Sequence, residues 1–67
     1  MEERRSFSEA ERERLPQVMA GLTAKQREVA SLALAGYSLT AIADRLDLAD
    51  STVRGFVRRI KRRLQKS

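Results

Sequence analysis

Apolar residues along this chain recur at helical spacing. The clearest case is the C-terminal stretch, where Val53, Val57, Ile60 and Leu64 follow one another at i, i+4, i+7 and i+11. That interval places all four side chains on one face of a helix, which we predict over residues 50–66. Few residues are β-branched, and no stretch alternates with the period of two that marks a strand. The chain is therefore predicted to be all-α.

A second helix is predicted over residues 24–35. Thr23 and Gln26 have the spacing of an N-terminal capping box, in which each side chain bonds the backbone N–H of the other residue. Gly36 follows the helix and is placed to end it with a left-handed backbone. The side chains expected to face the core are Val29, Leu32 and Ala33.

A third helix is predicted over residues 39–46, with Ser38 as its capping residue. Only residues 47–50 separate it from the C-terminal helix. Two helices joined by so short a turn, the second with polar residues outward, are typical of a helix-turn-helix. The side chains expected to face the core are Ile42, Ala43 and Leu46.

The N-terminal stretch, residues 8–21, also has helical character. Its start offers two Ser-x-x-Glu capping boxes, Ser6 to Glu9 and Ser8 to Glu11. Pro16 removes one helical hydrogen bond and clashes with the preceding turn, so we predict a kink or break there, with a new short helix opening at Pro16.

Together these elements predict a small helical bundle with two parts. Residues 1–21 are expected to form an acidic, amphipathic N-terminal helical segment. Residues 22–67 are expected to form the three-helix core that contains the helix-turn-helix.

The positive charge of the chain is concentrated in its last eighteen residues. Residues 1–49 carry seven basic and eight acidic side chains, whereas residues 50–67 carry seven basic side chains against Asp50 alone. The net charge of +5 therefore comes entirely from the C-terminal helix. A helix that packs one face and leaves the rest basic is suited to a polyanion such as nucleic acid.

Composition excludes several other classes of function. With 67 residues, the chain has room for one small domain, and it contains neither cysteine nor histidine. We therefore expect no disulfide, no metal site, no cofactor and no enzyme activity. No apolar run approaches the roughly 20 residues of a membrane span. The N-terminus also lacks the apolar segment of a secretory signal, so a cytoplasmic protein is predicted.

Three ordered blocks between Leu22 and Leu64 resemble a known family. They are Leu22-Thr23-x-Lys25-Gln26-Arg27-Glu28-Val29, then Ala35-Gly36-Tyr37-Ser38-x-x-x-Ile42-Ala43-x-x-Leu46, then Thr52-Val53-Arg54 with Ile60 and Leu64. This pattern is similar to the DNA-binding domain of LuxR/FixJ-type regulators and to region 4 of bacterial sigma factors. The resemblance implies a helix-turn-helix fold and DNA binding.

The chain departs from the family pattern at a few positions. Asp47 stands where the family usually has glycine in the turn, and Phe56 replaces a frequent histidine. Ala49 stands where a serine commonly caps the recognition helix, so Asp50 or Ser51 is expected to cap instead. LuxR-type domains normally continue past the recognition helix into a further, dimerising helix. The given sequence ends with the recognition helix, so we expect an architecture closer to that of sigma region 4.

The outward face of the basic helix supplies the candidate site residues. In helix-turn-helix proteins the N-terminal part of this helix meets base edges in the major groove, which selects Ser51, Arg54, Gly55 and Arg58. The resemblance also points to the last three. Gly55 has no side chain to read with, so we expect it to allow a close backbone approach. The residues expected to contact phosphates are Thr23, Ser38, Arg59, Lys61, Arg62, Arg63 and Lys66.

The leading hypothesis is a sequence-specific transcription regulator that binds double-stranded DNA through residues 50–66. An alternative is a stand-alone sigma-region-4-like module that docks on RNA polymerase or on another regulator. A homodimer through residues 6–22 is a further expectation, because one reading helix contacts few base pairs. An arginine-rich helix that binds RNA is a third alternative, disfavoured by the three family blocks. A membrane-surface helix is less favoured, because the domain core needs the apolar stripe.

Overall fold

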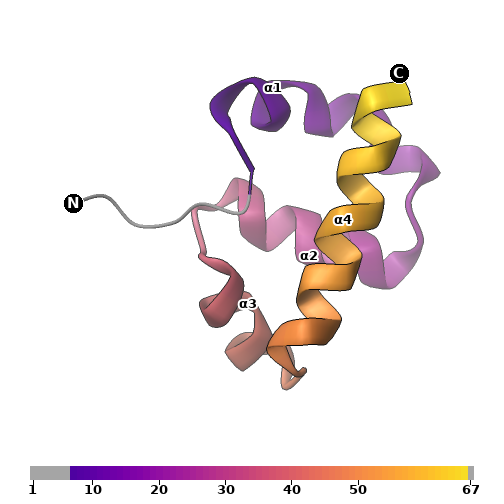
Figure 1. Ribbon diagram of the computed structural model, residues 1–67. Coiled ribbons are helices and arrows are strands. Elements are labelled where there is room, and N and C mark those ends of the chain that lie inside the picture. The colour runs from indigo at the N-terminus through magenta and orange to yellow at the C-terminus, as the bar shows by residue number, and fades with distance from the viewer. Residues whose placement is uncertain (1–6, 67) are drawn as a thin grey trace.

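The computed structural model describes residues 7–66, except for the side chain of Lys66. In this part of the chain the protein is an all-helical bundle, as the sequence predicts. The elements are α1 (Glu9–Val18), a short 3₁₀ helix η1 (Met19–Gly21), α2 (Ala24–Leu34), α3 (Leu39–Leu46) and α4 (Asp50–Lys66). The long helix α4 packs against the three others. Helix α3 lies beside the N-terminal end of α4, and α1 lies beside its C-terminal end (Figure 1).

The prediction of a break at Pro16 is wrong. Helix α1 runs through Pro16 to Val18, and the short helix opens three residues later, at Met19. Pro16 costs one backbone hydrogen bond, but its ring is exposed, and the neighbouring Leu15 is completely buried and holds this turn in place. The capping box of Ser8 and Glu11 is confirmed, with bonds of 2.8 and 3.2 Å. The alternative box at Ser6 lies outside the described residues.

The caps predicted for α2 and α3 are confirmed. The Thr23 hydroxyl accepts a bond from the Gln26 N–H, and the Gln26 side chain accepts one from the Thr23 N–H. The Ser38 hydroxyl accepts a bond from the Ala41 N–H at 3.2 Å. Gly36 has the expected positive φ, 103°. Helix α2 ends at Leu34, one residue earlier than predicted.

The turn between α3 and α4 is built on Asp47, which adopts the left-handed conformation with φ 58° and ψ 47°. The Leu48 N–H bonds back to the Ala43 carbonyl at 2.9 Å, the pattern of a Schellman C-cap. The expectation that Asp50 or Ser51 caps α4 is wrong. Helix α4 begins at Asp50, so Ala49 occupies the cap position and its carbonyl accepts the first bond, from Val53.

One core joins all four helices. The four predicted residues of α4 are buried, with at most 5% exposure, and they pack with Val29 of α2 and Ile42 of α3. Phe7 and Leu15 belong to the same cluster, so the N-terminal segment contributes to the core. Arg12 of α1 also donates a 3.0 Å bond to the Leu34 carbonyl at the end of α2.

Two residues predicted to face the core are only half-buried. Leu32 of α2 and Leu46 of α3 pack against the core cluster but remain partly exposed, while Ala30 takes a fully buried position. The helical spacing gives the correct side of each helix. It does not show that the packing of α2 against α3 leaves these two leucines partly exposed to solvent.

Candidate nucleic-acid interface

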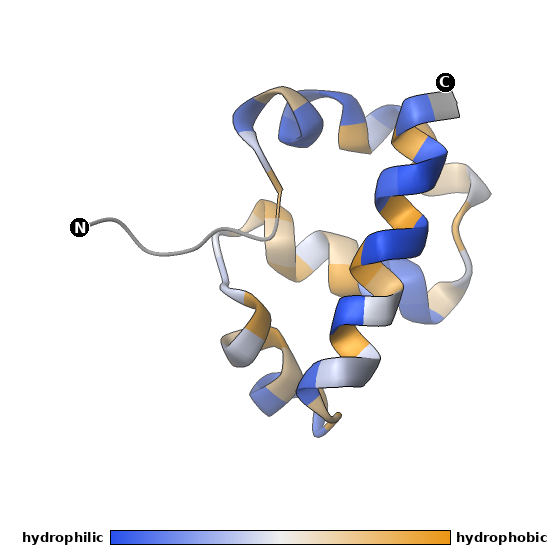
Figure 2. Ribbon diagram, viewed as in Figure 1, coloured by the Kyte–Doolittle hydropathy of each residue, from blue (hydrophilic) through white to orange (hydrophobic). Residues whose placement is uncertain are grey.

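Helix α4 separates apolar and basic side chains onto different faces. Figure 2 shows the alternation of hydrophobic and hydrophilic residues along its length. Val53 and Ile60 are fully buried, whereas Arg54, Arg58 and Arg59 are exposed. Burying the apolar seam against α2 and α3 therefore fixes which way the arginines point.

The four candidate base-contacting residues lie together in the N-terminal half of α4. They occupy positions i, i+3, i+4 and i+7 of one helix, a spacing that gives a single face. Ser51, Arg54 and Arg58 are exposed and Gly55 is half-buried. A Cβ added at Gly55 would meet no atom within 4 Å, so packing inside the protein does not require a glycine there.

A second group of arginines gathers nearer the C-terminal end of α4. Arg59, Arg62 and Arg63 line a hollow of about 210 Å³ together with Gln26, which lies in the first turn of α2. The guanidinium of Arg63 also lies against Gly21, and it has room there because Gly21 carries no side chain. Three guanidinium groups around one opening can donate charge-assisted hydrogen bonds to a phosphate.

Lys61 does not join this group. Its Nζ lies 3.8 Å from a carboxylate oxygen of Glu11 and 5.7 Å from the centre of the Phe7 ring. Both partners belong to the N-terminal segment, which packs against the other flank of α4. The side chain is 39% exposed, so the ion pair with Glu11 is screened by solvent and contributes little stability.

Thr23 and Ser38 are not among the residues that line the arginine hollow, although Gln26, the capping partner of Thr23, is. The hydroxyls of Thr23 and Ser38 accept the bonds that cap α2 and α3, and these two residues mark the starts of different helices. The side chain of Lys66 lies outside the described residues.

The sequence model of the family described as "Bacterial regulatory proteins, luxR family" matches residues 20–67. The chain belongs to this luxR family. The LuxR-type part of the sequence resemblance is thereby confirmed, and similarity to sigma region 4 stays a prediction. No curated protein and no solved structure matches the chain.

LuxR-type helix-turn-helix domains are DNA-binding regulators, and this luxR-family chain places α3 and α4 as the two helices of that motif. Within the described residues, no group of three or more acidic side chains is arranged to hold a metal ion. No helix in the same part of the chain is long and apolar enough to cross a membrane.

Sequence reasoning missed two residues beside the arginine hollow of this luxR-family domain. The sequence indicates only a capping role for Gln26, because its contribution to the hollow depends on how α2 crosses α4. The sequence predicts Gly21 only as the last residue of a helical stretch, whereas its contact with Arg63 joins segments more than forty positions apart. Helical periodicity carries no signal for either contact.

Proposed function

We propose that this luxR-family domain is a sequence-specific transcription regulator that reads the major groove of double-stranded DNA with α4. The observation that carries the proposal is the exposure of Ser51, Arg54 and Arg58 on a helix whose opposite face is fully buried. A helix fixed in this way can enter the groove as a rigid rod. An arginine fork can then bridge O6 and N7 of a guanine, at about 1–3 kcal/mol of discrimination per good pair.

The two groups of arginines suit two different tasks. Arg54 and Arg62 are eight residues apart, which corresponds to about 12 Å along a helix. This distance is similar to the roughly 12 Å width of the major groove. With Arg54 at the base edges, Arg62 and its neighbours around the hollow can reach the phosphates that flank the groove. They would contribute affinity without sequence information.

Two alanine variants test this division. Bound duplexes are first selected from a random pool, and affinity is then measured for the best site and for single-base variants of it. Arg54→Ala should flatten the differences among these sites. Arg62→Ala should weaken all of them about equally and reduce the slope of log K against log salt by roughly one. Equal, sequence-independent losses from both variants would contradict the division.

Pairing through residues 6–22 and docking on RNA polymerase are further proposals. The apolar side chains of the N-terminal segment are largely used inside the domain, because Phe7 and Leu15 are buried and Val18 and Met19 pack partly against the core. A dimer through this segment would therefore rest on a polar surface. Sedimentation of the free protein measures its oligomeric state directly, and a strict monomer at high micromolar concentration would exclude such a dimer.

A further inference from the structure

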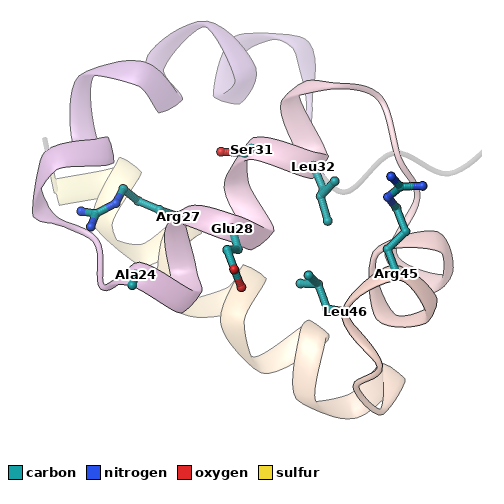
Figure 3. Close-up of a pocket in the computed structure, with 7 residues that line it drawn as sticks. All are labelled: Ala24, Arg27, Glu28, Ser31, Leu32, Arg45 and Leu46. Atoms are coloured by element: carbon teal, nitrogen blue, oxygen red, sulfur yellow. The ribbon is translucent and has the colours of Figure 1, made fainter.

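A shallow hollow lies between α2 and α3 and opens to solvent. It encloses about 560 Å³, and its apolar floor is formed by the two half-buried leucines, Leu32 and Leu46. Figure 3 shows these side chains pointing toward one another from the two helices. The hollow is large enough for a bulky aliphatic or aromatic side chain. Partly exposed leucines that face each other across a depression are typical of a contact surface.

The charge around this floor is predominantly positive. Arg27 and Arg45 lie at opposite ends of the hollow (Figure 3), and neither pairs with a carboxylate among the described residues. Arg27 donates a 2.9 Å bond to the Leu22 carbonyl, and Arg45 stacks over the Tyr37 ring at 4.9 Å. Both guanidinium groups are therefore held in place while their charge stays uncompensated.

The one acidic residue of the rim does not reverse this balance. Glu28 also lines the hollow, but its carboxylate lies 3.4 Å from Nζ of Lys25 in the preceding turn of the same helix. An occupant would thus meet an apolar floor with Arg45 at one end and, at the other end, Arg27, whose side chain extends away from the leucines (Figure 3). The complementary surface has an aliphatic side chain between two carboxylates.

The hollow is separate from the proposed base contacts on α4, although Ala24 in its lining follows the predicted phosphate contact Thr23. Its lining residues come from α2 and α3, and none of them belongs to α4. A partner seated there would leave Arg54 and Arg58 uncovered. We therefore expect that the two surfaces can be occupied together.

We propose that this hollow docks an acidic amphipathic helix of a partner protein. One aliphatic side chain of that helix lies between Leu32 and Leu46, and carboxylates one turn before and one turn after it face Arg27 and Arg45. Residues four positions apart lie about 6 Å apart along a helix, so the two carboxylates are roughly 12 Å apart. A helix in a groove with one apolar anchor and charged flanks is a common mode of peptide recognition.

The test uses the full chain and a fluorescein-labelled helical peptide with one central leucine and a glutamate four residues to either side. Two matched peptides replace the leucine by alanine or both glutamates by lysine. Binding is followed by fluorescence anisotropy at physiological salt, and backbone amide shifts map the site. We expect saturable binding, shifts at Leu32 and Leu46, and at least tenfold weaker binding of both control peptides.

Charge-reversal variants separate this surface from the DNA surface. Arg45→Glu should weaken the peptide at least tenfold and leave DNA affinity within about threefold. Arg54→Glu makes the same charge change on α4, and it should weaken DNA and leave the peptide within about twofold. Circular dichroism of each variant checks that weaker binding does not result from loss of folding. The neutral variant Arg45→Gln serves as a milder control at the same position.

Three outcomes would overturn the proposal. The first is equal binding of the alanine-substituted peptide, which would mean that the leucine floor plays no part. The second is a loss with Arg54→Glu as large as with Arg45→Glu, which would place the peptide on the DNA-binding face. The third is no saturable binding up to about 1 mM, an affinity too weak for a docking site. None of these outcomes affects the proposed DNA binding, which is measured separately.

Discussion

Replacing Gly55 by alanine tests whether this glycine serves the fold or the DNA. Gly55 lies in the interior of the 17-residue helix α4, and it is not among the residues with positive φ. A Cβ at this position meets no atom within 4 Å. Glycine is therefore neither a conformational nor a packing requirement of the folded chain, and it weakens the helix.

The expected stability change follows from helix propensity. In a helix interior, glycine is about 0.8–1.0 kcal/mol less favourable than alanine, chiefly because it loses more backbone freedom on folding. Gly55→Ala should raise the free energy of unfolding by about that amount. In a domain of this size, it should raise the melting temperature by roughly 4–8 °C. Urea and thermal unfolding, followed by circular dichroism, measure both quantities.

DNA binding should change in the opposite direction. If the backbone at Gly55 approaches base edges closely, an added methyl group crowds that contact at a cost of about 1–3 kcal/mol, or roughly 5–150-fold in affinity. A variant that is more stable and binds less well would assign the glycine to recognition. Unchanged or improved DNA affinity would show that the DNA does not approach there.

Gly36→Ala is the matched control. A Cβ at Gly36 also meets nothing within 4 Å, but its φ is 103°. The alanine must adopt a rarely populated backbone conformation, so Gly36→Ala should lower stability by about 1–3 kcal/mol. If Gly55→Ala lowers stability as Gly36→Ala does, the propensity argument for Gly55 is refuted.

Three further substitutions, two of them with a control variant, test the fold. Asp47→Gly should raise the free energy of unfolding by about 0.5–1 kcal/mol, because glycine adopts the left-handed conformation without steric strain. A lower free energy of unfolding in urea would mean that the Asp47 side chain contributes more stability than its strain costs. Thr23→Ala should lower stability by about 0.5–2 kcal/mol through loss of the cap, whereas Thr40→Ala, at an exposed position within α3, should not. Ile60→Ala should cost about 2–5 kcal/mol and come close to unfolding the domain, while Ile60→Val should cost only about 0.5–1.5 kcal/mol; similar melting temperatures for the two would contradict the buried seam.

The sequence predicts the helix-turn-helix well because its signals are local. The bounds of α3 and α4 and the caps at Thr23 and Ser38 depend on residues within one turn of each other. The buried seam of α4 follows from its own spacing. Such features require no knowledge of the other helices.

Features that depend on how helices meet are not predicted. Helix α1 continues through Pro16 because the buried Leu15 anchors that turn, which a propensity for helix breaking does not include. The charge pattern of α4 predicts a phosphate contact for Lys61, but it gives no indication that α1 supplies Glu11 as a neighbour of this side chain. The Leu32–Leu46 hollow likewise depends on how α2 and α3 pack against each other.

The central claim is that α4 presents its arginines to the major groove while its seam stays packed. Intermolecular nuclear Overhauser effects in a complex with a selected duplex test it most directly. The account predicts contacts from Arg54 and Arg58 to base protons in the major groove, with Val57 and Ile60 still contacting Val29 and Ile42. Contacts to the minor groove, or DNA contacts made mainly by α1, would contradict it.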